Sequence, residues 1–205
     1  MVTLDAVLLP LVLGFGCASY LVGCRAVLAG RYAPNTFSRV VWLLLAVVST
    51  AGVVGGGGGP AAVLLSGVFL AGNAAMCLLS LRRGTRGLGR VELGCLALLV
   101  VSGVVWVVFD APVVSLAVSL LAHAVGGAPT YRAVWRDPGS ESAGFWSLFL
   151  VASALSLLGD LGRPLPGLLF PAWFVLFDGG MTALSLRRRG RRAGPVRTRR
   201  GTTSG

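Results

Sequence analysis

Seven apolar stretches separated by short polar segments dominate the hydropathy pattern of the chain. Each is close to the ~20 residues that an α-helix needs to cross the hydrocarbon core of a bilayer. The stretches are continuously apolar, unlike the alternating strands of about ten residues in a membrane β-barrel. The pattern predicts an all-α integral membrane protein with seven transmembrane helices, over residues 6–28, 40–57, 61–81, 91–109, 112–131, 144–160 and 165–186.

The composition narrows the class of protein further. Of the 205 residues, 55% are hydrophobic and 12% are charged, against about a quarter charged in soluble domains, and the mean hydropathy is +0.83. So few charged residues cannot cover the surface of a soluble domain of this length, which excludes a soluble enzyme. One histidine and four scattered cysteines form no metal-ligand cluster, so we expect neither enzymatic activity nor a cofactor.

The arginines predict how the chain sits in the membrane. All 18 basic residues are arginines, and all but Arg163 fall in the alternate loops and the C-terminal tail that share one side. Because basic loops stay in the cytoplasm, we expect the N-terminus outside and the C-terminus inside a plasma or inner cell membrane. The tail, 187–205, is expected to be disordered and to contact anionic lipid headgroups through Arg187–Arg200. No aromatic residues interleave with these arginines, so nucleic-acid binding is not expected.

The chain contains an internal repeat. The segment Asn73–Arg83 matches Asp178–Arg188, with six of the last eight positions identical. Two further matches occur in the same order at nearly the same offset: Arg25-Ala26-Val27 with Arg132-Ala133-Val134, and Trp42 and Ser49 with Trp146 and Ser153. The matches predict a 3+1+3 arrangement of parallel repeats, with a first repeat over 1–83, a linker helix within 84–110 and a second repeat over 111–186.

Two loops add a resemblance to a known family. The segment from Arg25 through Pro34 and Asn35 to Trp42, and the segment 128–142 leading to Trp146, resemble the two loops of a set of uncharacterised bacterial PQ-loop-like proteins. With the 3+1+3 arrangement, the chain resembles the wider PQ-loop/MtN3 and SWEET superfamily. It has no Pro-Gln dipeptide, because it has no Gln; Pro129-Thr130 stands there in the second repeat.

That resemblance implies alternating access between two three-helix halves. It also implies that polar residues on the third helix of each repeat line the substrate site, which places the site at Asn73 and Asp178. These two residues and His123 each precede a loop arginine by nine positions, which puts them about 13–14 Å into the membrane. Polar groups at that depth are costly and usually functional. Two readings stay open: a substrate or proton site, or pairing among the three that only holds helices together.

Other polar and aromatic residues have weaker assignments. Trp42, Trp146 and Pro129 are expected at an interface or a gate, and Ser49 and Ser153 are expected to face a cavity or a backbone carbonyl one turn back. Asp110 and Asp160 lie at the outer helix ends, where we expect them to be solvated.

The sequence favours a facilitator or proton-coupled carrier of a small, unidentified solute, either as a monomer or as a homo-oligomer. The alternative is a non-transporting receptor or assembly factor with the same fold, since fold does not decide function. A polar cavity between the halves would favour transport, and a dry, close-packed seam would favour the alternative.

Overall fold

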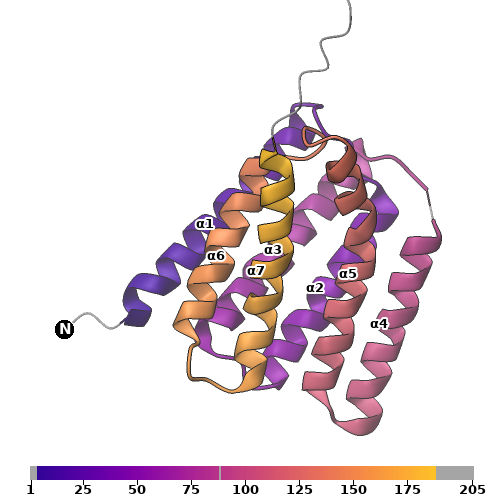
Figure 1. Cartoon of the computed structure of the whole chain (residues 1–205). Helices are drawn as coiled ribbons and strands as arrows, with labels where there is room; N and C mark the ends of the chain where they lie inside the picture. Colours follow the sequence, from indigo (N-terminus) through magenta and orange to yellow (C-terminus); the bar gives the residue numbers. More distant parts are fainter. Residues whose placement is uncertain (1–3, 88, 188–205) are drawn as a thin grey trace, which may run out of the picture.

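The computed structural model describes residues 4–87 and 89–187, which form a bundle of seven helices (Figure 1). Six of them are long and apolar enough to cross a membrane, and α6 is a shorter apolar helix of 17 residues. This confirms the all-α, multi-pass character predicted from the hydropathy pattern. The helices are α1 (Leu4–Leu28), α2 (Thr36–Gly55), α3 (Pro60–Arg83), α4 (Arg90–Phe109), α5 (Pro112–Arg136), α6 (Ala143–Gly159) and α7 (Leu165–Leu186).

Two predicted spans were too short at the Arg-rich end. Helix α2 begins at Thr36 because Asn35 caps it, its side-chain oxygen accepting a hydrogen bond from the Ser38 N–H. Helix α5 continues past the predicted end at residue 131 to Arg136, through the fully buried Val134. Hydropathy detects the part of a helix that lies in lipid, while backbone hydrogen bonds carry the helix on into the headgroup region.

The helices pack in two groups of three, with α4 at one edge. Helix α3 lies between α1 and α2, and α7 lies between α5 and α6. The groups meet mainly where α1 packs against α6 and α2 against α5, and α4 packs on α5 and α2 (Figure 1).

Polarity is distributed as expected for a bundle surrounded by lipid. Large apolar side chains are exposed along the outside, as at Val107 (85%), Leu176 (72%) and Val100 (61%). Serines, Asn73, His123 and Asp178 are buried inside. The bundle therefore has the surface of a multi-pass membrane protein and a partly polar interior.

The expectation for Asp160 was wrong. Its side chain is fully buried at the end of α6, where Oδ2 accepts a hydrogen bond from the Ala62 N–H at 2.8 Å, and Oδ1 lies 3.4 Å from the Arg163 guanidinium. Asp160 thus caps the first turn of α3, whose backbone N–H groups have no partner within the helix. The cap comes from a helix of the other group of three, which no local sequence rule detects.

Most of the basic tail, 188–205, lies outside the described residues.

Candidate functional site

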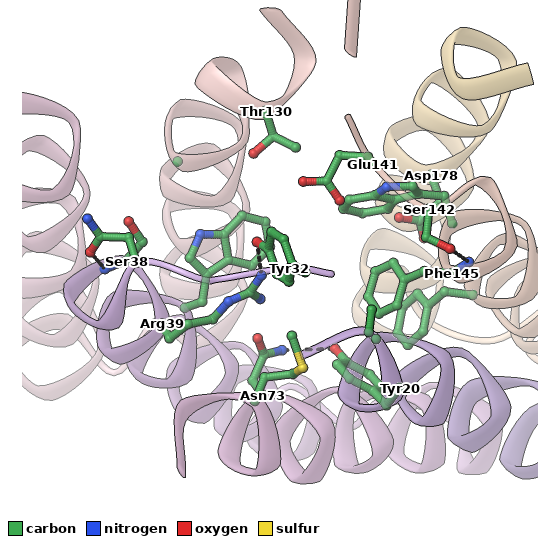
Figure 2. A pocket seen from close by; sticks show the side chains of 18 of the residues that line it. Tyr20, Tyr32, Ser38, Arg39, Asn73, Thr130, Glu141, Ser142, Phe145 and Asp178 are labelled. Atoms are coloured by element: carbon green, nitrogen blue, oxygen red, sulfur yellow. Dashed lines mark hydrogen bonds between the residues drawn. The ribbon is translucent and has the colours of Figure 1, made fainter. Parts of the chain in front are cut away.

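A cavity of about 490 Å³ lies between the two groups of helices (Figure 2). Its inner wall includes mid-helix residues such as Asn73 and His123, and its lining extends to the exposed loop residues Arg31, Gly139 and Ser140. The cavity therefore runs from the middle of the bundle to the surface at the Arg-rich end. Its size falls within the range of small-molecule sites.

The three polar residues predicted at mid-depth all line this cavity, and each has a different environment. The Asn73 amide donates hydrogen bonds to the Tyr20 hydroxyl and to the Phe69 carbonyl, both at 2.9 Å. These bonds fix the amide nitrogen. The tyrosine ring reaches this position because α3 carries Gly72 beneath it, where a Cβ would collide with the ring.

His123 lies inside a cage of aromatic rings. The Trp173 indole N–H donates to Nδ1 at 3.2 Å, so Nδ1 carries the lone pair and Nε2 carries the proton in a neutral ring. Rings of Trp42 and Phe177 lie with centroids 4.5 Å from the imidazole. Nε2 is buried without a hydrogen-bond partner.

Asp178 is 1% exposed, and its Oδ2 has no hydrogen-bond partner within the described residues. No hydrogen bond joins any two of Asn73, His123 and Asp178 among the contacts of that region. The hypothesis that they pair directly to lock helices together is therefore wrong. Instead they border one shared space, and two of them keep an unused polar atom.

The gating or interface candidates fall into two groups. Trp42, Trp146 and Pro129 line the cavity. Trp146 is 8% exposed and packs against Phe177, so it lies inside the bundle and not at the lipid-facing surface. The serines lie away from the cavity: Ser49 shares a hydrogen bond with Ser119 of α5 at 2.9 Å, and Ser153 donates to the Phe149 carbonyl one turn back.

Sequence reasoning missed the charged groups at the mouth of the cavity. Arg39 comes from the first turn of α2, donates to the Tyr32 hydroxyl at 2.7 Å, and lies over that ring at 5.6 Å. Glu141 comes from the loop before α6. Burial raises the pKa of the Glu141 carboxyl above its usual range, and the positive charge of Arg39 partly offsets this effect. Arg39 was counted only as a topology signal, and Glu141 only as part of a loop motif.

Comparison with known proteins adds no assignment. No protein-family model matches the chain, and neither the curated proteins nor the solved structures contain a match. The site must therefore be interpreted from its own residues.

Proposed function

We propose that this protein is a facilitator or proton-coupled carrier of a small solute, and that it works by alternating access between α1–α3 and α5–α7. The observation that carries the proposal is the cavity at the seam between these groups, bordered by Asn73 from one and Asp178 from the other. A dry seam would have favoured a receptor or assembly factor. Movement of one group against the other would change the cavity that both of them border.

The opposite end of the bundle supports the same proposal, because it is closed. The buried Asp160 carboxylate joins α6 to the first turn of α3, and Arg163 lies 3.9 Å from Asp5 of α1. A side chain at Gly59 would collide with Asp160. A cavity open at one end and closed at the other is the geometry of one state of an alternating-access carrier.

The packing supports treating the two groups as repeats. In each group the third helix lies between the first two. If α1, α2 and α3 correspond to α5, α6 and α7, the contact between α1 and α6 corresponds to the contact between α5 and α2, and both contacts are present. One contact between an aromatic ring and a glycine occurs in both groups, with the ring and the glycine on opposite helices. Tyr20 of α1 packs on Gly72 of α3, while Gly127 of α5 packs under Phe177 of α7, at the matching positions of the repeat. We infer a 3+1+3 arrangement with α4 as the linking helix.

Orientation and coupling complete the proposal. The arginine asymmetry supports a cell-membrane protein with the cavity open to the cytoplasm. His123 and Asp178 are the cavity's two ionisable groups at mid-depth, and both have an unpartnered polar atom. A carboxyl and an imidazole in that position support proton transfer during the cycle.

Transport is tested by solute uptake into vesicles reconstituted with the purified protein, with and without an imposed proton gradient. The proposal expects saturable uptake of at least one small solute above protein-free vesicles. The matched control is the Asp178→Ala variant, reconstituted at the same protein density. A screen with no uptake for either protein would favour the non-transporting alternative.

A further inference from the structure

We propose that the cavity binds a small amphoteric solute, one that carries a carboxylate and an ammonium group on an apolar body. This inference deepens the proposed function, since it names the solute class of the same cavity. It depends on which charged groups of the cavity are already engaged and which are free to meet a ligand.

Some charged residues that line the cavity are already engaged by other parts of the protein or lie at its rim, so they are not candidates for binding a ligand. Glu92 lines the cavity, but its Oε1 accepts a hydrogen bond from Ser38 at 2.6 Å and its Oε2 accepts one from the Gly89 N–H at 3.0 Å. This carboxylate caps α4. Arg31 is exposed at the rim. The ionisable groups left to meet a ligand are then Arg39 and Glu141 near the mouth of the cavity and Asp178 deeper inside.

Arg39 is an open anion site. Among the described residues, no carboxylate lies within ion-pair distance of its guanidinium, and its hydrogen bond goes to the neutral Tyr32 hydroxyl. A guanidinium presents five N–H donors in a planar fork that matches a carboxylate. Tyr32 holds the guanidinium in place by the hydrogen bond and by its ring, so the fork is oriented before a ligand arrives.

The complementary groups lie across the cavity, on the second half of the molecule. Figure 2 shows Arg39 on one side and Glu141 and Asp178 on the other. The Asp178 Oδ2 is buried and has no hydrogen-bond partner among the described residues. The positive charge of Arg39 lowers the pKa of the Glu141 carboxyl and so counteracts the effect of burial on it. An ammonium group seated between these carboxyls would supply the donor that the Asp178 Oδ2 lacks and would place a positive charge beside Glu141.

The remaining walls are aromatic. Rings of Tyr20, Trp42, Phe69, Phe145 and Trp146 line the space between the charged ends. Such walls suit an aliphatic or aromatic body, and their faces also attract an ammonium group. A neutral polyol would give neither the Arg39 guanidinium nor the carboxyls across the cavity a group of opposite charge. A simple anion would pair only with Arg39, and a simple amine would pair only with the carboxyls. An amphoteric solute is the class that satisfies both ends and bridges the two halves.

The test is a binding measurement on the 205-residue chain in detergent, which does not require transport. The probes are L-leucine and L-phenylalanine, each compared with the amine lacking its carboxylate (3-methylbutylamine, phenethylamine) and the acid lacking its amino group (4-methylpentanoate, 3-phenylpropanoate). Glucose is the neutral probe. We expect at least one amino acid to bind about tenfold or more tightly than both of its single-charge analogues. Equal binding of an amino acid and its acid, or binding of glucose alone, would overturn the proposal.

Two variants assign the ends. Arg39→Gln should weaken amino-acid and acid binding while leaving amine binding unchanged, and Glu141→Gln should weaken amino-acid and amine binding while leaving acid binding unchanged. Arg82→Gln and Asp110→Asn remove exposed charges away from the cavity and should change nothing. If Arg39→Gln and Glu141→Gln weaken every probe equally, these residues only shape the cavity and the assignment is wrong.

The same set of measurements separates this inference from the proposed function. Amino-acid binding without any flux in reconstituted vesicles supports the solute class and refutes the carrier. Flux of another solute by a protein that binds no amino acid supports the carrier and refutes the solute class.

Discussion

The two ends of this bundle are built from similar helices but treat charge in opposite ways. At the Arg-rich end, Arg39 and Glu141 face an open cavity and have no ion-pair partner within the described residues. At the other end, Asp160 is fully buried and engaged by a backbone N–H and an arginine. One end keeps its polar groups available to a ligand, and the other uses them to join the two halves. The difference teaches that polar contacts join the helix groups at one end, while at the other end the polar groups border a cavity, which under the proposed function receives the solute.

The largest expected effect falls on the cavity. Asp178→Ala should abolish transport in reconstituted vesicles while the protein still accumulates in the membrane, because the carboxyl borders the cavity and holds no other helix by a hydrogen bond through Oδ2. Asp178→Asn keeps the shape and cannot take up a proton. It should retain passage and lose dependence on a proton gradient. If membrane levels fall together with activity, the residue is structural.

The second effect falls on the closed end and on stability. Asp160→Ala leaves the Ala62 N–H without its acceptor and should lower the free energy of unfolding by about 1–3 kcal/mol. Asp160→Asn retains an acceptor oxygen and should lose less. Thermal unfolding of the purified variants in detergent gives the comparison. Identical midpoints for wild type and both variants would mean that this end is not held by Asp160.

The third prediction compares the two ends by accessibility. In a background without native cysteines, Ser140→Cys at the cavity mouth should react with a membrane-impermeant maleimide applied from the cytoplasmic side. Ala62→Cys, at a fully buried position beside Asp160, should stay protected from both sides. Adding Asp160→Ala should expose Ala62→Cys from the outside. Labelling of Ser140→Cys only from the outside would reverse the proposed orientation.

The smallest effect concerns pH at the open end. Because burial raises the pKa of Glu141 in the folded protein, the neutral carboxyl favours folding. That contribution is fully present below the ordinary pKa of Glu and is lost as the pH rises through the raised value. The unfolding midpoint of the wild type should therefore fall slightly more across this window than that of Glu141→Gln. Parallel pH profiles for the two proteins would place Glu141 in ordinary solvent.

Much of the fold followed from the apolar pattern, since a segment that crosses lipid must satisfy its backbone by forming a helix. Counting residues back from the loop arginines also placed Asn73, His123 and Asp178 at one depth, and all three border the cavity. A helix has a fixed rise per residue, so depth is a local property that sequence spacing records.

Three features required the tertiary structure, and each depends on residues distant in the chain. Trp173, and not Asp178, is the hydrogen-bond partner of His123, because helix rotation decides which side chains meet. Asp160 became a buried cap because the end of α6 meets the start of α3. Arg39 and Glu141 became opposite walls of one cavity because α2 and the loop before α6 meet across the seam. The hydropathy pattern was enough to define which segments are helices, and residue spacing was enough to predict that three polar residues lie at one level of the bundle. The packing of the two halves decided which of those residues face one another, because side-chain partners between helices depend on orientation, which hydropathy does not encode.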